Sequence, residues 1–405
     1  MQNEPAAPHP LRGTPSLLRA INDRTALELL LEHGPMSRAD IGALTGLSKP
    51  TTSHLLLRLK EAGLVVLEGR RAARGPAAEL YAVNPRSAYV AGMDVTPERI
   101  MAAVADVTGR VLAEFELPTP GRGGGNAAVR TRRALQGATA AAGLAISDLR
   151  HVVLGTPGAL DPKTGELVYA PQLVRWEGPG LLGRIQDALG VPVDIENDVT
   201  VVAMAEYDHG AAHGSPSFAL LWVSDGIGMA HVRGGVPHRG ATGGAGEVGY
   251  MPVPGQPVFR DVRRMNTGGF QCLAGGPVVR KILRDAGFPA RDAAVAVARA
   301  VTALPRPGER ADRAGAALDE VAVRVATGLA IITSVLDPEL IVLAGDVLQA
   351  GGEPLRSRID TELHAIAISR PRVRVGSVEG NPVLLGALHL ALSAARRAVF
   401  GPTVA

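Results

Sequence analysis

A chain of 405 residues with 46% hydrophobic content can bury a substantial core and is expected to form two or three domains. Its apolar runs are all shorter than the ~20 residues that span a bilayer, and residues 1–15 lack the apolar segment of a signal peptide. Its single cysteine, Cys272, excludes an internal disulfide framework and a zinc cluster built from several cysteines. These features predict a soluble, cytoplasmic protein that meets no membrane.

The excess positive charge lies in the first fifth of the chain. The formal net charge is +3, and residues 1–86 hold eleven Lys and Arg against eight Asp and Glu, whereas the remainder holds 31 of each sign. A basic segment of this kind indicates contact with a polyanion. The aromatic content of 3% argues against single-stranded nucleic acid, which proteins bind by stacking bases on aromatic rings.

After a flexible tail over residues 1–16, the chain follows the pattern of a helix-turn-helix. Ser37 followed by Asp40 is a helix-opening capping pattern, Gly46 supplies a turn, and Ser48 caps the next helix. The start of that helix is rich in short polar side chains, which can reach base edges and phosphates in a major groove. The residues of these helices predicted to contact DNA are Arg38, Ser48, Lys49, Thr51, Thr52, Ser53, His54 and Arg58.

Residues 64–83 alternate as two strands around a basic loop, the pattern of a β-wing. Arg70, Arg71 and Arg74 in this hairpin are suited to phosphate or minor-groove contacts. The alternative is a helical hairpin that makes protein contacts, with a solvated arginine loop. Because helices, turn and basic hairpin follow one another in the right order, residues 17–85 are predicted to form a winged helix-turn-helix that binds double-stranded DNA.

Residues 86–405 have the pattern of an α/β protein with two similar lobes and a cleft between them. The first three predicted strands form a meander over Ala88–Val95, Arg99–Ala105 and Val111–Glu116, and alternating helices and strands follow. A second set begins with SFALLWVSDGIGMAHVRGGVPH, and an apolar helix over Glu320–Leu336 leads into the buried strand of DPELIVLAGDV.

Five stretches together resemble the ROK family (repressors, open reading frames, kinases) over nearly the full length of the chain. They are SRADIGALTGLSKPTTSHLLLRLKEAGLV, GTPGALDPKTGELVYAPQL, IENDVTVVAMAE, GAGEVGYM and LDPELIVLAGDV. The chain looks most like the transcriptional regulators of that family, of the xylose-repressor and N-acetylglucosamine-repressor kind. The resemblance implies a winged helix-turn-helix followed by an actin-like, ribonuclease-H-type sugar-kinase fold, in homodimers or homotetramers.

The resemblance also implies a site for a sugar or sugar-phosphate effector. The family binds sugar hydroxyls with a Glu-Asn-Asp corner and with a glutamate in a Gly-rich loop, because carboxylates and amides can bridge vicinal hydroxyls. Asn197 and Asp198 also suit the start of a helix. The residues carried over to the effector site are Gly158, Gln172, Asn197, Asp198, Glu247, Tyr250 and Gln271.

Two departures from the family pattern bear on cofactors. Tyr250 stands where the family has a histidine that binds both sugar and a structural zinc, and Gly269 falls where a cysteine of the zinc cluster is expected. Zinc requires about four N or S ligands. The expectation is therefore no zinc and no other cofactor, with an altered effector pocket.

The phosphate-binding loops of the family's kinases are also altered. Asp94-Val95-Thr96-Pro97 lacks the glycines that let backbone amides cradle a phosphate, and Asp225 places a negative charge in the second loop. The chain is therefore expected to be a regulator of carbohydrate uptake or metabolism and not an enzyme. A repressor is favoured over an activator. The alternatives are a sugar kinase with a DNA-binding domain and a DNA-binding regulator that responds to no ligand.

Overall fold

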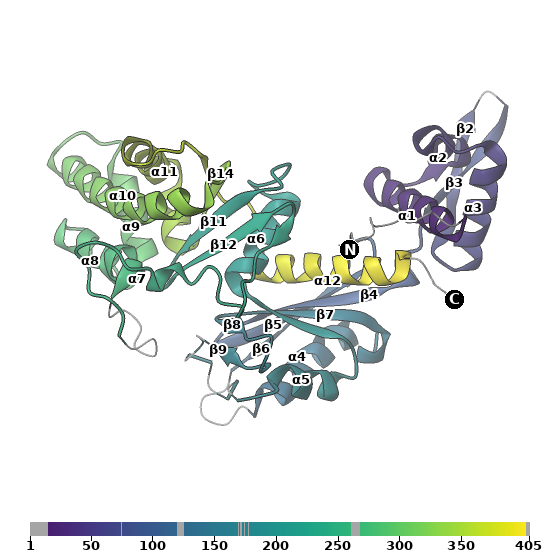
Figure 1. Ribbon diagram of the computed structural model, residues 1–405, viewed down its shortest axis with the longest axis horizontal. Coiled ribbons are helices and arrows are strands. Elements are labelled where there is room, and N and C mark those ends of the chain that lie inside the picture. The colour runs from purple at the N-terminus through teal and green to yellow at the C-terminus, as the bar shows by residue number, and fades with distance from the viewer. Residues whose placement is uncertain are drawn as a thin grey trace, which may run out of the picture.

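The computed structural model describes residues 15–401 apart from 74, 120–124, 169, 171, 174, 177 and 261–267. Figure 1 shows an N-terminal domain and two α/β lobes, with the last helix of the chain running from the lobes toward the N-terminal domain. The elements of the N-terminal domain are α1 (Pro15–His33), β1 (Met36–Ser37), α2 (Arg38–Thr45), α3 (Lys49–Glu61), β2 (Val65–Ala73) and β3 (Gly75–Val83).

Local sequence signals fix the helix-turn-helix as predicted. Ser37 caps α2 in a reciprocal capping box with Asp40, and Gly46 ends α2 in the left-handed conformation with φ of 70°. Ser48 caps α3 by accepting a hydrogen bond from the Thr51 amide. These interactions satisfy helix-end groups that would otherwise lack partners, so the boundaries of α2 and α3 are confirmed.

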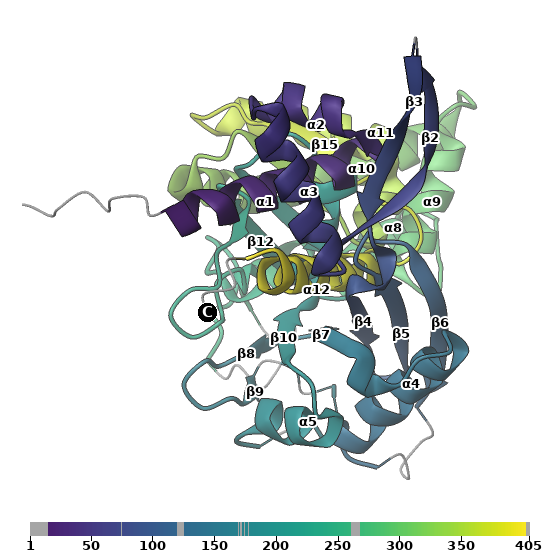
Figure 2. The ribbon, with the colours of Figure 1, turned by 90° about the vertical axis from the view of Figure 1, so that its right-hand side faces the viewer.

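The N-terminal domain is held by the inner face of α3. Leu55, Leu56 and Leu59 are almost fully buried, and they pack in one cluster with Leu27 and Leu30 of α1. Burying each such leucine contributes roughly 1.5–3 kcal/mol. The hairpin of β2 and β3 extends beyond the helices as the wing (Figure 2), with β1 completing a sheet of order β1-β3-β2.

The first lobe is a five-stranded sheet covered by α4 and α5 on one face and by the last helix of the chain on the other. The predicted meander is confirmed with ends shifted by one or two residues. The elements are η1 (Pro85–Ser87), β4 (Tyr89–Val95), β5 (Arg99–Asp106), β6 (Val111–Pro118), α4 (Ala127–Ala141), η2 (Ile146–Asp148), β7 (Leu149–Thr156), β8 (Ala159–Leu160), β9 (Leu167–Val168), α5 (Leu181–Leu189) and β10 (Val193–Asn197).

The second lobe repeats this arrangement, with α6 on one face of its sheet and α10 and α11 on the other. The helix predicted over Glu320–Leu336 is longer than expected, because α10 begins at Glu309. The elements are α6 (Asp198–His209), β11 (Phe218–Val223), β12 (Ile227–Arg233), β13 (Val236–Pro237), η3 (Val248–Tyr250), α7 (Gly269–Ala274), α8 (Gly276–Asp285), α9 (Ala293–Ala303), α10 (Glu309–Leu336), β14 (Leu340–Ala344), α11 (Asp346–Ile366) and β15 (Arg372–Val375).

The two large sheets have the same strand order. The sheets read β6-β5-β4-β7-β10 and β13-β12-β11-β14-β15. In each, the first strand of a three-stranded antiparallel meander pairs in parallel with a fourth strand, and the fourth pairs in parallel with a fifth. In each lobe the parallel strands end at one edge, which is where open α/β sheets bind ligands. The duplication predicted from the sequence is therefore present.

The chain ends with α12 (Pro382–Phe400), which returns to the first lobe. It is the one described helix that is long and apolar enough to cross a membrane by length and composition. Its apolar residues Leu384, Leu388 and Ala391 are buried against the first sheet, so packing accounts for its composition.

Candidate DNA-binding surface and effector site

The outer face of α3 presents the polar side chains that sequence reasoning assigned to DNA. Lys49, Thr51 and His54 are exposed, and Ser53 is half-buried. Ser48 is exposed as well, but its hydroxyl lies 2.8 Å from that of Thr51 and serves as the helix cap. A helix with a capped, polar N-terminal end and a free outer face fits the major groove.

Thr52 corrects the prediction for this helix. Its side chain has no exposed surface, its hydroxyl donates to the Ser48 carbonyl at 3.1 Å, and it faces Gly42 of α2. It lies three, four and seven residues before Leu55, Leu56 and Leu59, which is the spacing of the inner face. Thr52 therefore joins α2 to α3 inside the domain and cannot contact a base.

Three predicted arginines have partners within the N-terminal domain. Arg38 donates to the hydroxyl of Ser53 at 3.1 Å, and Arg58 pairs with Asp23 of α1 at 2.5 Å. Arg71 of the wing pairs with Asp40 at 2.8 Å, so the wing is tied to α2 by an ion pair. Hydrogen bonds from Ser37, together with this pair, lower the pKa of Asp40. Exposed ion pairs contribute only about 0–1 kcal/mol, so Arg71 can exchange Asp40 for a phosphate at little cost.

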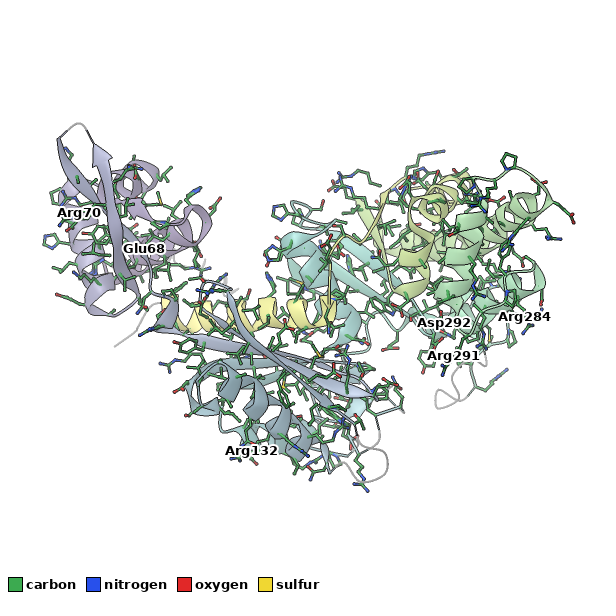
Figure 3. All side chains as sticks on the ribbon, turned by 180° about the vertical axis from the view of Figure 1, so that it is seen from behind. Glu68, Arg70, Arg132, Arg284, Arg291 and Asp292 are labelled. Atoms are coloured by element: carbon green, nitrogen blue, oxygen red, sulfur yellow. The ribbon has the colours of Figure 1, made fainter. Side chains whose placement is uncertain are left out.

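The wing carries a further exposed arginine, Arg70, in a long ion pair with Glu79. Arg70 is exposed on β2, at 4.0 Å from Glu79, and Figure 3 labels it on the hairpin beside Glu68. Arg74, the third arginine predicted for the wing, lies outside the described residues.

Leu57 is a residue that sequence reasoning missed on the same surface. Its side chain is 53% exposed on α3, at helical spacing from Ser53 and His54. An apolar group on the outer face of such a helix is suited to contact with the methyl group of thymine. The signal was available, because Leu57 falls outside the inner spacing of Leu55, Leu56 and Leu59.

The candidate effector site lies where the parallel strands of the first sheet end. Asp94 of β4 and Asn197 of β10 flank the end of β7, since Asp94 pairs with Gly155 and Asn197 pairs with Thr156. Asp198 opens α6 immediately after β10. The strand order thus brings together residues that lie about a hundred positions apart in the sequence.

Hydrogen bonds fix the Asn197-Asp198 corner. The Asn197 amide nitrogen donates to the Gly158 carbonyl at 2.9 Å and to the Asp198 carboxylate at 3.1 Å, while its oxygen caps α6 through the Thr200 amide. Gly158 adopts a φ of 82°, and a Cβ there would overlap the Val168 carbonyl oxygen. Asn197 and Gly158 therefore position Asp198.

Glu247 is the least satisfied carboxylate of the site. It accepts no hydrogen bond from any residue that the structure describes, and burial together with the charge of Asp198 raises its pKa to about 7. Burial, with a smaller contribution from Asp94, also raises the pKa of Asp198 to about 7. We call Asp94, Asp198 and Glu247 the carboxyl cluster. Groups of this kind gain strong hydrogen bonds from hydroxyl donors.

The glycines around Glu247 let the loop backbone pack closely against β12. Gly246 has a φ of 100°, its carbonyl accepts from the Met229 amide at 2.9 Å, and a Cβ on it would overlap the Met229 carbonyl. A Cβ on Gly249 would likewise crowd the carbonyl of Ile227. These glycines dock the loop backbone against β12 and so hold Glu247 in place.

Three predicted effector residues lie in other surroundings. Gln271 is buried, with its oxygen accepting from the Ile227 amide at 2.9 Å and its nitrogen donating to the Asp225 carbonyl at 2.7 Å, so it braces the turn between β11 and β12. The Tyr250 ring packs against Phe259, with ring centroids 4.6 Å apart. Gln172 is exposed in the loop after β9. The effector role of Gln271 is corrected to a structural one, because both ends of its amide hold backbone.

Sequence reasoning also missed the partners of two carboxylates. Asp94 is 5% exposed, accepts from the Asn381 side chain at 2.8 Å and lies 3.5 Å from Arg99, and burial raises its pKa. Glu196 pairs with Arg239 at 2.6 Å. Asn381 is 287 residues from Asp94, so no local pattern could have revealed the contact.

Two loops match the phosphate sites of the kinases. The first is closed by hydrogen bonds, and the second borders a cavity whose charges balance. Thr96 bonds the backbone of Arg99 in both directions, which closes the turn after β4. The turn at Asp225 borders a cavity of about 420 Å³. Charged residues that line this cavity are Asp225, Arg280, Arg291 and Asp292. Two arginines face two aspartates there, so the cavity carries no net positive charge for a polyphosphate.

The residues that the structure describes include no group of three or more His, Cys, Asp or Glu placed to hold a metal ion. The segment aligned with the family's cysteine cluster falls partly in residues 261–267, outside the described chain. Gly269, which stands at a cysteine position of that cluster, has a φ of 60° and opens α7.

Comparison with known proteins agrees with this architecture. The sequence pattern of the ROK family matches residues 90–394, and that of the MarR family matches residues 21–75. These two matches define a protein with a DNA-binding winged helix-turn-helix and a sugar-kinase-like α/β unit. The chain belongs to the ROK family.

Individual relatives include both regulators and kinases. The chain is 24% identical to the xylose repressor of Caldicellulosiruptor bescii over 94% of this chain and 98% of that protein. A solved ROK transcriptional regulator, a homologue of the Escherichia coli MLC protein, has a TM-score of 0.72 and 19% identity, covering 95% of this chain and 98% of that one. The ROK hexokinase of Thermus thermophilus has a TM-score of 0.63 and 29% identity, covering 76% of this chain and 99% of that one.

Proposed function

We propose that this protein is a sequence-specific DNA-binding regulator, a repressor of carbohydrate uptake or metabolism genes, which acts in the cytoplasm. The observation that carries the proposal is that one chain combines two units. The first is a winged helix-turn-helix whose α3 has an exposed polar outer face, and the second is a ROK unit that matches the family over residues 90–394. Relatives that span both units, such as the Caldicellulosiruptor xylose repressor, are named as repressors. Residues 17–85 form the DNA-binding unit and residues 86–405 the effector and oligomerisation unit, in a homodimer or homotetramer whose two heads read two half-sites.

We further propose that a sugar or sugar phosphate binds at the carboxyl cluster and changes the affinity for DNA. Asp198 and Glu247 supply charged acceptors for hydroxyls, and Asn197 with Gly158 holds Asp198 in place. Tyr250, three residues after Glu247, is a candidate for the rim of the site, and Gln172 is a candidate by family resemblance alone. Binding to only one of two states of the protein shifts the population toward that state.

Phosphotransfer is the less favoured function. The closed turn at Thr96 and the balanced charges around Asp225 support this ranking, because ATP phosphates are bound by backbone amides and net positive charge. ATP-dependent phosphorylation assayed over a panel of sugars tests this point, and measurable turnover would overturn the assignment.

Selection of duplexes from a random library by the purified full chain tests the proposed function. We expect enrichment of a roughly palindromic operator, followed by a change in its dissociation constant when sugars or sugar phosphates are added. A chain that enriches no sequence would contradict the regulator. An operator whose affinity no sugar changes would favour a regulator without a ligand.

His54→Ala is expected to relax base preference without loss of fold. His54 is exposed on the outer face of α3, and each good base contact is worth about 1–3 kcal/mol of discrimination. Competition between the selected operator and single-base variants measures the effect. Thr52→Ala is the matched comparison, because its buried hydroxyl should affect thermal stability and not the ranking of bases. An unchanged ranking for His54→Ala would remove this residue from the interface.

Arg71→Ala is expected to weaken binding to all duplexes and to reduce the slope of log K against log salt by about 1. The reason is the loss of one phosphate contact, made when Arg71 leaves Asp40. Fluorescence anisotropy over 50–200 mM salt measures the slope. Arg284→Ala is the control, because Arg284 has a similar exposure and an aspartate partner on α8. If both variants gave the wild-type slope, the wing would not contact phosphate.

A further inference from the structure

The last helix connects the two sites described above. At 1.5 Å per residue, the 19 residues of α12 span about 28 Å. Figure 1 shows α12 running along β4 from the lobes toward the N-terminal domain. Its two ends lie in different functional regions of the molecule.

The first end is bonded to the carboxyl cluster. Asn381 caps α12 by accepting from the Leu384 amide at 3.1 Å, and its amide nitrogen donates to Asp94 at 2.8 Å. Asp94 and the Asn197-Asp198 corner flank the end of β7 at the same edge of the first sheet, and the charge of Asp94 adds to the effect of burial in raising the pKa of Asp198. A charge or hydrogen bond that changes at Asp198 therefore acts on the carboxylate that Asn381 holds.

The second end is part of the DNA-binding domain. Phe400 is 5% exposed and packs in the cluster that contains Leu27, Leu30 and Leu59 of that domain. Arg396 donates through Nε and Nη2 to the Val107 carbonyl at 3.0 and 2.9 Å, and Val107 belongs to the same cluster.

Between its ends, α12 is packed backbone to backbone. A Cβ on Gly92 of β4 would overlap the Leu388 amide nitrogen, and a Cβ on Gly386 would overlap the Val201 carbonyl of α6. His389 also pairs with Asp208 of α6 at 2.7 Å. Contacts this close leave no flexible side chain to absorb a shift, so a displacement at one end is transmitted along the helix.

The junction with the DNA-binding domain has room for such a displacement. A cavity of about 710 Å³ lies between α1, the end of α6 and the end of α12. Residues that line it include Arg24, Glu28, Asp208, Arg397 and Phe400. Ala88, Val107 and Phe400 pack in the core of the DNA-binding domain, whereas the part of the junction between α1 and the ends of α6 and α12 is hollow.

We propose that α12 couples the carboxyl cluster to the DNA-binding domain, with Asn381 as the positioning residue that links the helix to Asp94. This coupling rests on the proposed function. A ligand hydroxyl or a proton bound at the cluster competes with the Asn381 amide for Asp94. Release of that hydrogen bond shifts the start of α12, and the shift changes the packing of Phe400 in the DNA-binding domain.

Asn381→Ser tests the coupling, because serine still caps a helix but is too short to reach Asp94. Asn126→Ser is the matched control, since Asn126 caps α4 through the Val129 amide and lies at neither site. Two quantities are measured on the full chain: amide hydrogen exchange of α1, and the dissociation constant for the selected operator without added sugar. For a repressor that is released by its ligand, Asn381→Ser should speed exchange in α1 and weaken operator binding ~10-fold.

The outcomes separate the coupling from the proposed function. If Asn381→Ser matched Asn126→Ser in both quantities, the coupling would be refuted. A chain that binds no selected duplex would refute the proposed function, while the exchange of α1 would still decide the coupling. If Asn381→Ser does not fold, Asn381→Asp serves instead, since it keeps the cap and repels Asp94; unchanged exchange in that variant also refutes the coupling.

Discussion

Glu206→Ala should lower the free energy of unfolding by about 3–5 kcal/mol, because it removes a buried carboxylate whose two oxygens accept three backbone hydrogen bonds. Glu206 is 2% exposed and accepts hydrogen bonds from the amides of Ala211 at 2.7 Å, Ser377 at 3.1 Å and Val378 at 3.1 Å. It thus ties the end of α6 to the segment that leads into α12. Alanine would leave three part-buried N–H groups without this partner.

Urea denaturation followed by circular dichroism measures this loss. Glu206→Gln should cost less than alanine, because the remaining oxygen still accepts some of these hydrogen bonds. Glu320→Ala is the control, since Glu320 forms an exposed pair with Arg324 on α10, and its removal should change stability by at most about 0.5 kcal/mol. A loss below about 1 kcal/mol for Glu206→Ala would show that the amides find other partners.

Glu247→Gln should have the opposite effect and raise the free energy of unfolding at pH 8. Burial and the neighbouring Asp198 raise the pKa of Glu247 from 4.5 to about 7. Between these two values the folded protein holds a proton that the unfolded chain releases, so stability falls as pH rises through this window. Glutamine has no such charge. The gain is about 1–2 kcal/mol at pH 8, less than the full linkage value because Asp198 and Glu247 share protons.

Thermal or urea unfolding at pH 8 and at pH 5 tests the sign. The advantage of Glu247→Gln over the wild type should shrink toward zero at pH 5, where the wild-type carboxyl is protonated. A gain that is equal at both pH values would mean that the carboxylate is not responsible. Under the proposed function, the variant should also lose the rise in stability caused by an added sugar, because glutamine removes the carboxylate acceptor that binds the sugar hydroxyl.

Local chemistry explains why the helix-turn-helix was predicted well. The caps at Ser37 and Ser48 and the turn at Gly46 each depend on residues within four positions, and all three are confirmed. Thr52 was the exception, because its polar character was given more weight than its place on the inner face of α3. Helical spacing from Leu55, Leu56 and Leu59 would have placed it correctly.

The candidate site was harder to predict, because its contacts join distant parts of the chain. Family resemblance brought Asp198 and Glu247 together, and the strand order of the first sheet accounts for Asp94 and Asn197. Gln271 holds backbone at Asp225 and Ile227, more than forty residues away, a role that no periodicity indicates. The contact of Asn381 with Asp94 depends on the last helix returning to the first strand of the first lobe.

The position of Phe400 has a consequence for how the protein is made. The DNA-binding domain precedes both lobes in the sequence, yet its core includes Phe400 of α12, which follows them. Leu27, Leu30 and Leu59 can therefore complete their packing only after α12 has been synthesised. A chain that still lacks α12 would carry α3 on an incomplete core, so full packing of the DNA-binding domain follows the translation of both lobes.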